Sequence, residues 1–311
     1  MWAGAEMTGL RIACIGECMI ELNRLDLDAG SAGIGFAGDT LNTAVYLARL
    51  GCDVAYVTNL GLDRFSDRME QRWRGEGIGC ALVGRHPDRL PGLYAIEVDA
   101  AGERSFRYWR EASAARTLFS GIGAALADLA QFDVIYLSGI TLAILPAEIR
   151  GALIATAAGL KAAGKMVVFD TNHRPRLWPN EAAARDSFAA MWAATSLALP
   201  SFDDEARLYP GLSPQQVIAR IAALGPAEVV LKNGARGPLI AVNGAVDQTD
   251  LPEVARVVDT SGAGDSFNAG YLAARLRGDA PLAAAAAGHR LASVVIGHHG
   301  AVIPRTAMPA I

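Results

Sequence analysis

Short runs rich in β-branched residues alternate along this chain with alanine-rich stretches of helical length, and this alternation restricts the possible fold more than any other feature. The runs expected to be strands are 11–15, 53–59, 134–138, 166–170, 197–200 and 229–232. The stretches expected to be helices are 39–50, 64–74, 147–163, 181–194 and 214–224. Such alternation favours the α/β class, with a mostly parallel sheet covered by helices on both faces.

Composition indicates a globular chain with a substantial core. The 311 residues could form two domains, but α/β chains of this length often build one large core with a small appendage. Apolar residues make up 52% and charged residues 19%, so enough apolar surface is available to bury. The formal net charge is −4 and the basic residues form no cluster, so nucleic acid is not an expected partner.

The cysteines and the N-terminus favour a cytoplasmic protein. Cysteines at positions 14, 18, 52 and 80 have neither CxxC nor paired zinc spacing and are interpreted as reduced thiols. The opening residues lack a basic region followed by an apolar stretch, so we expect a flexible tail at 1–9 and one domain at 10–311. The longest apolar stretches, such as 188–200, are too short to cross a bilayer, and no membrane partner is expected.

Polar side chains follow three of the expected strands at the points where those strands end. Asp170, Asn172 and Arg174 come after one strand, residues 201–204 follow another, and Lys232 ends a third. In open parallel sheets, ligands bind beyond the carboxyl ends of the strands. The sequence therefore predicts a ligand site along this edge.

One segment breaks the alternation. Residues 93–98 and 104–110 are extended runs joined by a five-residue loop, which is typical of a β-hairpin. A symmetric register places Tyr94 opposite Tyr108, and Arg110 shares their face because strand side chains alternate. This aromatic and cationic face fits either a lid over a ligand or ordinary core packing of the hairpin.

Two glycine-containing runs match nucleotide-binding patterns without the context that those patterns need. Residues 33–38 fit GxGxxG, but they lie well beyond the first strand instead of at its end, which argues against a dinucleotide site. Residues 159–165 resemble a Walker loop, but Met166 replaces the required hydroxyl and the order is helix then strand. Gly164 fits a helix C-cap better.

The most specific chemical signal is the run DTSGAGD at 259–265. Its small residues let the amides of Gly262, Ala263 and Gly264 converge where a helix begins, and the unpaired donors at this end of the helix dipole attract phosphate. Asp265 beside that cradle is suited to take a proton from an alcohol that attacks a phosphoryl group. The run alone also fits a plain helix start whose acid complements the dipole.

The run DTSGAGDSFNAG resembles the C-terminal motif of the PfkB, or ribokinase-like, carbohydrate kinases, and FAGDTLN at 36–42 resembles their sugar-binding motif. The resemblance extends from residue 12 to residue 301. It implies a three-layer α/β/α fold with a small β-stranded lid, expected at about 17–37 and 90–111. Within the family, the segments GECMIEL, RLPGLY, 108–115, FDTNHRPRLW and LPSFDDE are most similar to 2-keto-3-deoxygluconate kinases.

This resemblance implies a role for each matched position. Asp265 is the expected base, and the amides of residues 262–264 are the expected anion hole. The positions expected to bind the sugar are Gly38, Asp39, Asn42, Tyr94, Tyr108, Arg110 and Arg174. Those expected to bind ATP are Ser201, Lys232, Gly234, Gly237 and His289.

The resemblance also implies cations. Asp204 is the expected Mg²⁺ ligand, but Ser-Phe-Asp-Asp replaces the family's Asn-x-x-Glu, so Asp203 and Glu205 stay as alternatives. A monovalent cation near Asp259 is allowed by the family analogy. So is a homodimer formed through the lid. The family's Gly-Gly is Ala37-Gly38 here, which changes the loop before the sugar-binding residues.

The two arginines favour a sugar acid as the substrate. A substrate carboxylate calls for a planar guanidinium able to pair with both oxygens, and Arg110 and Arg174 supply it. We therefore expect ATP-dependent phosphorylation of the terminal hydroxyl of 2-keto-3-deoxygluconate. The alternatives are a neutral-sugar kinase of the same family, such as a fructokinase, and a non-catalytic sugar-acid sensor. A hydride-transferring enzyme is disfavoured by the position of GxGxxG.

Overall fold

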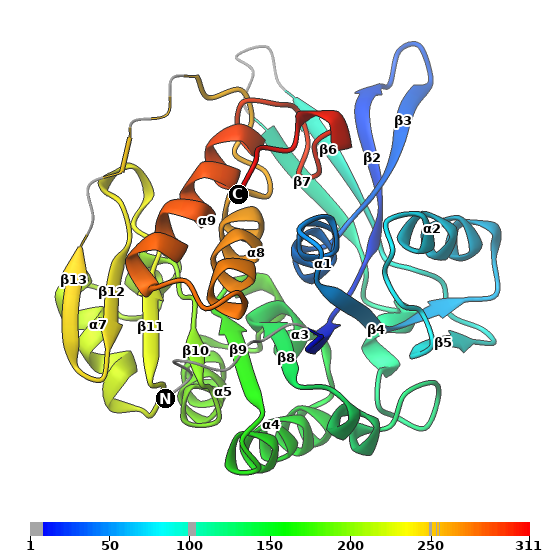
Figure 1. Cartoon of the computed structure of the whole chain (residues 1–311). Coiled ribbons are helices and arrows are strands. Elements are labelled where there is room, and N and C mark those ends of the chain that lie inside the picture. Colours follow the sequence, from blue (N-terminus) through cyan, green and yellow to red (C-terminus); the bar gives the residue numbers. More distant parts are fainter. Residues whose placement is uncertain (1–8, 99–103, 249–250, 253, 255) are drawn as a thin grey trace.

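The computed structural model describes residues 9–98, 104–248, 251–252, 254 and 256–311 (Figure 1). The strands of the large sheet are β1 (Arg11–Ile15), β4 (Asp53–Gly61), β5 (Val83–His86), β8 (Val134–Ser138), β9 (Met166–Asp170), β10 (Leu197–Ala198), β11 (Glu228–Leu231), β12 (Leu239–Val242) and β13 (Ala245–Gln248). Those of the small sheet are β2 (Met19–Asp26), β3 (Ser31–Ala37), β6 (Leu93–Val98) and β7 (Arg104–Trp109). The α-helices are α1 (Asp39–Arg49), α2 (Arg64–Gly75), α3 (Gly139–Ile144), α4 (Ala147–Ala162), α5 (Glu181–Ala193), α6 (Phe202–Leu208), α7 (Pro214–Ala223), α8 (Ala263–Leu276) and α9 (Pro281–Val295).

The large sheet has the strand order β13-β12-β11-β10-β9-β8-β1-β4-β5 within the described residues. From β11 to β5 every pairing is parallel, whereas β12 and β13 are added antiparallel at one end. All residues of β8 and β9 are buried, which explains why these strands are continuous apolar runs without alternation. The predicted mostly parallel sheet is confirmed.

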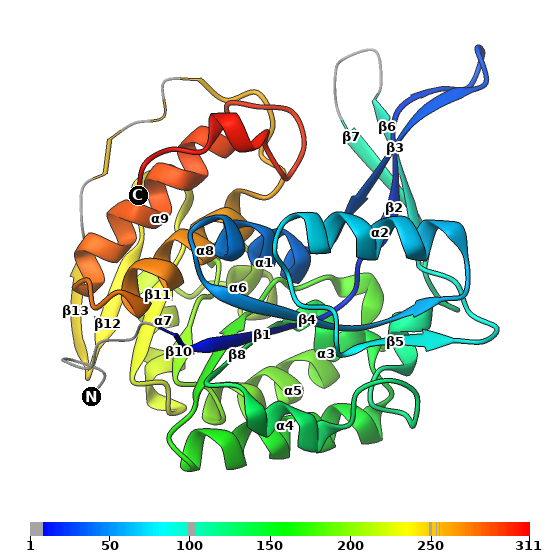
Figure 2. The ribbon, with the colours of Figure 1, turned by 45° about the vertical axis from the view of Figure 1, so that its right-hand side comes forward.

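Helices cover both faces of this sheet (Figure 2). The helices α1, α2, α8 and α9 lie on one face, and α3, α4, α5 and α7 lie on the other. Each face has its own apolar cluster: Tyr46, Tyr56 and Leu272 belong to one, and Phe169 and Trp192 belong to the other. The expected three-layer α/β/α arrangement is therefore present.

The small sheet has the order β3-β2-β6-β7 and projects from the large sheet beside α2 (Figure 2). Its strand β2 pairs antiparallel with β3 and parallel with β6, and β6 pairs antiparallel with β7. The predicted hairpin register is confirmed, because Tyr94 lies opposite Tyr108. The small sheet thus joins two segments of the chain, β2 with β3 and β6 with β7.

Several sequence predictions can be checked against the element bounds. The bounds predicted for β1, β8 and β9 are the observed ones, whereas β10 is only Leu197–Ala198 and β11 ends before Lys232. The first two glycines of the GxGxxG run, Gly33 and Gly35, pair with β2 inside β3, and only Gly38 lies at the start of α1, so these glycines form no phosphate-binding turn. Gly164 follows the end of α4 with a φ of 83°, as a helix C-cap requires.

The predicted tail at 1–9 lies outside the described residues except for residue 9. Across the described part of the chain, we found no helix with both the length and the apolar character needed to cross a bilayer.

Candidate active site

The start of α8 is built around a glycine that no other residue can replace without strain. Gly262 is the N-cap and has a φ of 72°, and a Cβ there would lie 2.6 Å from the carbonyl oxygen of Ala301. The Ala263 amide donates to Thr260 O over 3.2 Å, which leaves it less free for a phosphate than the sequence suggested. At Gly264 a Cβ would meet Lys232 Nζ at 3.6 Å, so a side chain there would fill the space between this ammonium group and the helix start.

Asp259 holds the turn that precedes α8. Its carboxylate accepts the backbone amide of Ser261 at 2.9 Å and that of Gly300 at 2.6 Å. These bonds tie the motif to the loop after α9. The position of the helix start therefore depends on a segment about forty residues away in the sequence, which supplies Gly300 and Ala301.

Asp265 lies in the first turn of α8 and is partly buried against α1. Its Oδ2 accepts a hydrogen bond from Asn42 Nδ2 at 2.8 Å, and its backbone oxygen accepts one from Thr43 Oγ1 at 3.2 Å. Burial raises the pKa of Asp265 from the ordinary 3.8 to about 7, and the charge of Asp39 adds to the increase while the Asn42 bond opposes it. A carboxyl group with this pKa can act as a general base at neutral pH.

The sugar-binding motif places Asp39 at the start of α1. The N-cap is Gly38, where a Cβ would lie 2.0 Å from the carbonyl oxygen of Glu17, so only glycine fits beside the first lid segment. Asp39 Oδ2 accepts a hydrogen bond from Asn172 Nδ2 at 2.6 Å. The two motifs that are farthest apart in the sequence thus meet, because α1 and α8 pack side by side and each presents a carboxylate.

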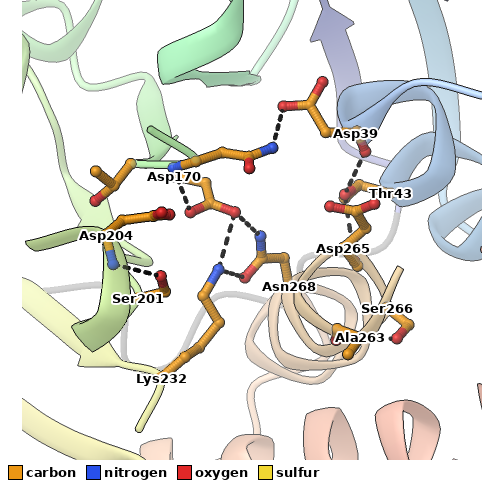
Figure 3. A network of polar contacts seen from close by, with 12 residues as sticks. Asp39, Thr43, Asp170, Ser201, Asp204, Lys232, Ala263, Asp265, Ser266 and Asn268 are labelled. Atoms are coloured by element: carbon orange, nitrogen blue, oxygen red, sulfur yellow. Dashed lines mark hydrogen bonds and ion pairs between the residues drawn. The ribbon is translucent and has the colours of Figure 1, made fainter. Parts of the chain in front are cut away.

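A buried polar network connects Lys232 to the same region (Figure 3). Asp170 Oδ2 accepts from Lys232 Nζ at 2.8 Å and from Asn268 Nδ2 at 2.6 Å. Lys232 Nζ also donates to Asn268 Oδ1 at 2.9 Å, and Asn268 donates to the hydroxyl of Tyr136 at 2.9 Å. Sequence reasoning assigned no role to Asn268 or Tyr136. The only signal available for Asn268 was its spacing, one helical turn after Asp265.

The lid contributes the aromatic and cationic face that the hairpin register predicted. The rings of Tyr94 and Tyr108 have centroids 5.7 Å apart, and the Arg110 guanidinium carbon lies 5.8 Å from the Tyr108 centroid. Arg110 is buried, however, and forms an ion pair with the buried carboxylate of Glu17. Nothing in the sequence pattern pairs Glu17 with Arg110, because the two residues are 93 positions apart. The Tyr94 hydroxyl donates to the carboxylate of Glu21 on β2.

Arg174 and Asp204 lie near each other beyond the ends of β9 and β10. The Arg174 side chain is 48% exposed, and its Nη1 lies 3.9 Å from Asp204 Oδ1. Asp204 is buried, and burial raises its pKa while the Arg174 charge opposes the increase. Asp203 is exposed, and Glu205 already accepts from Thr171 Oγ1 at 2.8 Å and from Arg220.

These contacts leave Asp204 as the acid best suited to a magnesium ion. In the described part of the chain, no group of three or more His, Cys, Asp or Glu side chains is arranged to hold a metal. Mg²⁺ bound with a nucleotide commonly uses one or two carboxylates together with water and phosphate oxygens. Among the buried carboxylates at this edge, Asp170 is paired with Lys232 and Glu205 with Arg220, and Asp204 fits that donor set best.

Comparison with known proteins identifies the family. The model of the pfkB family carbohydrate kinases matches residues 10–308. The chain belongs to the pfkB family of carbohydrate kinases. It is 46% identical to the 2-dehydro-3-deoxygluconokinase of Dickeya dadantii (strain 3937), over 98% of this chain and 100% of that protein.

Solved structures of pfkB-family proteins share the fold. The PfkB protein from Polaromonas sp. JS666 superposes with a TM-score of 0.82 at 26% identity and covers 92% of this chain and 95% of its own. The aminoimidazole riboside kinase from Salmonella enterica, complexed with aminoimidazole riboside and an ATP analog, superposes with a TM-score of 0.80 at 24% identity, over 96% of both chains.

The remaining predicted nucleotide residues of this pfkB kinase have local structural contacts. Ser201 Oγ caps α6 by accepting the amide of Asp204 at 3.4 Å. Gly234 and Gly237 have φ values of 55° and 75°, so turn geometry alone already requires glycine there. His289 Nε2 lies 2.8 Å from the carbonyl oxygen of Pro252, which is a structural contact of α9.

Proposed function

We propose that this chain is an ATP-dependent kinase that transfers the γ-phosphoryl group to the terminal hydroxyl of 2-keto-3-deoxygluconate, giving 2-keto-3-deoxy-6-phosphogluconate. The observation that carries the proposal is the position of Asp265, a carboxyl group with a raised pKa, next to a helix start and the ammonium group of Lys232. The 46% identity to a 2-dehydro-3-deoxygluconokinase over 98% of the chain supports the choice of substrate.

The geometry suggests how the residues divide the reaction. Asp265 accepts the proton of the terminal hydroxyl as the hydroxyl oxygen bonds to phosphorus and the bond to the leaving ADP breaks. The amides at the α8 start and the Lys232 ammonium group stabilise the charge that spreads over the transferred phosphoryl oxygens. Asn42 keeps the Asp265 carboxylate oriented through its 2.8 Å hydrogen bond. Asp39 and Asn42 at the α1 start face the sugar hydroxyls in this proposal.

The substrate carboxylate is assigned to Arg174 and Arg110, and the two arginines differ in availability. Arg110 is buried and already paired with Glu17, whereas Arg174 is half exposed and lies 3.9 Å from its nearest carboxylate. Arg174 Nη1 donates to the carbonyl oxygen of His173 at 2.9 Å, so the Nε and Nη2 edge is the one proposed to meet the substrate. A bidentate carboxylate contact needs two free N–H groups on one side of a guanidinium. Arg174 is therefore the main carboxylate partner in this proposal, and Arg110 supports the Tyr108 ring beside the sugar.

ATP and Mg²⁺ are the proposed cofactors. The aminoimidazole riboside kinase that shares this fold was solved with an ATP analog, which supports ATP as the phosphoryl donor. The Lys232 side of the site is assigned to the nucleotide because this ammonium group lies beside the start of α8. Asp204 would hold Mg²⁺, which neutralises phosphate charge when bound. Ser201, Gly234, Gly237 and His289 stay predicted nucleotide contacts. A monovalent cation near Asp259, a dimer through the lid and a cytoplasmic location also stay predictions.

A coupled assay of ADP release tests the proposal. Purified protein with Mg²⁺ and ATP should turn over 2-keto-3-deoxygluconate with a kcat/KM at least about 10²-fold above that for fructose or ribose, because only the acid can pair with Arg174. Equal turnover of the neutral sugars would contradict the choice of an acid. Binding of the acid without ADP release would instead favour the sensor.

A neutral-sugar kinase is the second candidate, since Glu17 already neutralises Arg110. The substitution Arg174→Ala distinguishes the sugar-acid kinase from the neutral-sugar kinase. This change should raise KM for the acid by roughly 10-fold or more if Arg174 binds the carboxylate, and leave KM unchanged if the substrate is neutral. Arg176→Ala, which changes an exposed arginine two positions on, is the matched control.

A further inference from the structure

Asn172 has a backbone conformation that few residues tolerate, and it lies inside the candidate site. It follows β9 by two residues, is 8% exposed and has a φ of 28°. Positive φ is unfavourable for residues with a Cβ, and asparagine is among the few types that adopt it with some frequency. Strained backbone of this kind persists where surrounding contacts fix it, and it occurs often at functional sites.

Asn172 is held by contacts from the proposed phosphate side of the site and from the proposed sugar side. Its backbone amide donates to Asp170 Oδ1 at 3.3 Å, while Asp170 Oδ2 accepts from Lys232 at 2.8 Å. Its side-chain Nδ2 donates to Asp39 Oδ2 at 2.6 Å. Asn172 thus lies between the carboxylate that holds Lys232 at the phosphate cradle and the carboxylate at the sugar-binding motif.

The two carboxylates that face the acceptor are anchored in the same manner. Asp265 Oδ2 accepts from the amide of Asn42, and Asp39 Oδ2 accepts from the amide of Asn172. In each case one oxygen is bound by the protein. For Asp39, Oδ1 has no hydrogen-bond partner among the described residues, so it stays available to accept from a ligand hydroxyl.

We propose that Asn172 is a positioning residue for the acceptor sugar and acts through Asp39. By holding Oδ2, it fixes the rotation of the Asp39 carboxylate and directs Oδ1 at the sugar hydroxyls. The left-handed backbone of Asn172 lets its side chain extend from the end of β9 to Asp39 on α1. This inference rests on the proposed kinase function for the identity of the acceptor.

Two substitutions separate the amide contact from the backbone strain. Asn172→Gly removes the amide and accepts a positive φ, whereas Asn172→Ala removes the amide and keeps the strain. Both should raise KM for the sugar acid by roughly 10-fold or more, the loss expected for a hydrogen bond to a charged group, while KM for ATP stays within about twofold. If Asn172 served only the fold, Asn172→Gly would change the melting temperature but would bind the acid like the wild type.

A double-mutant cycle tests whether Asn172 acts through Asp39. The parameter is kcat/KM for the acid at subsaturating concentrations, which is measurable even when saturation is not reached. Adding Asn172→Gly to Asp39→Ala should change kcat/KM by less than about twofold, because the group to be positioned is gone. A loss as large in that background as in the wild type would overturn the proposal.

The wild-type measurement keeps this inference distinct from the proposed function. If the wild type phosphorylates a neutral sugar instead of the acid, the proposed substrate is wrong. The KM and kcat/KM values of the Asn172 variants are then compared with those of the wild type for that sugar, and this comparison still decides the role of Asn172. If the wild type is active and Asn172→Gly matches it in KM, the positioning role is wrong and the kinase function stands.

Discussion

Asp265 is partly shielded from water and also lies in the first turn of a helix, and these two properties act on its charge in opposite directions. The helix dipole favours a carboxylate at this place, whereas burial and the nearby Asp39 charge disfavour it. Burial outweighs the dipole, because the pKa of Asp265 is raised to about 7. The residue therefore exchanges its proton in the pH range where the reaction must run.

Replacing Asp265 by asparagine should abolish most of the activity. Asp265→Asn keeps the shape and the Asn42 contact region but cannot accept a proton, so kcat should fall by about 10²–10⁴-fold with KM for ATP little changed. Initial rates of ADP release measure this. Asp203→Asn, at an exposed acid, is the control and should keep wild-type rates. Full activity of Asp265→Asn would remove the central residue of the proposed mechanism.

The raised pKa also makes a prediction for the dependence of rate on pH. The base must be deprotonated in the free enzyme, so kcat/KM for the sugar should rise with pH and level off above a pKa near 7. The pH dependence of kcat/KM, measured for the wild type and for Asp39→Asn, tests whether this rise comes from Asp265. Removing the Asp39 charge should move this limb to lower pH, and an unmoved limb would assign it to another group.

The stability of the fold should also depend on the protonation of Asp265, but in the opposite direction from activity. Stability should decrease as pH rises. Between the ordinary 3.8 and about 7 the folded chain binds the Asp265 proton more tightly than the unfolded chain. The free energy of unfolding contributed by this group is therefore fully present at low pH and decreases as pH rises through this window. Asp265→Asn should melt at a higher temperature than the wild type at about pH 8, with the difference shrinking at about pH 5. An equal difference at both pH values would contradict this.

At the scale of elements, the start of α8 shows how two glycines in one motif serve different purposes. Gly262 is required by its φ of 72° and its contact with Ala301, whereas Gly264 lies in the helix beside Lys232 and meets no backbone clash. The first glycine is a condition for the fold, whereas the second is proposed to keep space for the phosphate. The sequence motif itself does not distinguish these purposes.

Two alanine substitutions should separate these purposes. Gly262→Ala should destabilise the protein by about 1–3 kcal/mol through strain at positive φ. Gly264→Ala should leave the melting temperature equal or slightly raised, because alanine favours helix, yet should reduce kcat/KM by roughly 10-fold or more where its methyl group meets the phosphate. Thermal melts and the ADP assay on both variants measure this. The reverse pattern would place the phosphate elsewhere.

The lid strand β7 offers a similar matched pair. Tyr108 and Trp109 are adjacent and both exposed, at 44% and 61%, but their side chains point to opposite faces of the small sheet. Tyr108→Ala should raise KM for the sugar by roughly 10-fold, while Trp109→Ala should leave KM unchanged. If Trp109→Ala alone raised KM, the sugar would lie against the other face of the lid.

At the scale of the whole molecule, the site lies where the large sheet, the α1–α8 pair and the lid meet. The residues that end β9, β10 and β11 come together because parallel strands place their carboxyl ends at one edge. The lid is a separate sheet. Its two chain segments are joined by the buried ion pair between Arg110, which follows β7, and Glu17, which precedes β2. Breaking this pair by removing one partner would leave an uncompensated buried charge.

Ligand binding should therefore change the lid more than the large sheet. Amides of β2, β3, β6 and β7 should exchange more slowly with deuterium when the sugar acid is added, whereas those of β8 and β9, already fully buried, should be unaffected. Hydrogen exchange read by mass spectrometry measures both regions at once. Slower exchange confined to β8 and β9 would show that the lid does not close on the ligand.

The fold could be predicted from the sequence to a large extent because it depends on local patterns. Fully buried strands such as β8 and β9 require continuous apolar runs, and the hairpin register follows from symmetric strands around one loop. The strands β12 and β13 were not predicted, although Asn243 and Gly244 between them, with φ values of 49° and 87°, form a two-residue turn typical of a β-hairpin. The strand β12 is buried, whereas β13 is exposed throughout. An exposed edge strand leaves only a weak pattern in the sequence.

The sequence by itself determined that glycines and an acid stand together at a helix start, that a mostly parallel sheet forms, and that two tyrosines face each other on a hairpin. These features depend on backbone sterics, side-chain alternation and apolar periodicity, which act over a few residues. Only the tertiary structure decided that Glu17 neutralises Arg110, that Asp170 holds Lys232 and that Asn172 anchors Asp39. These pairs join residues 62 to 133 positions apart in the sequence, and chain packing alone brings such groups within hydrogen-bonding distance.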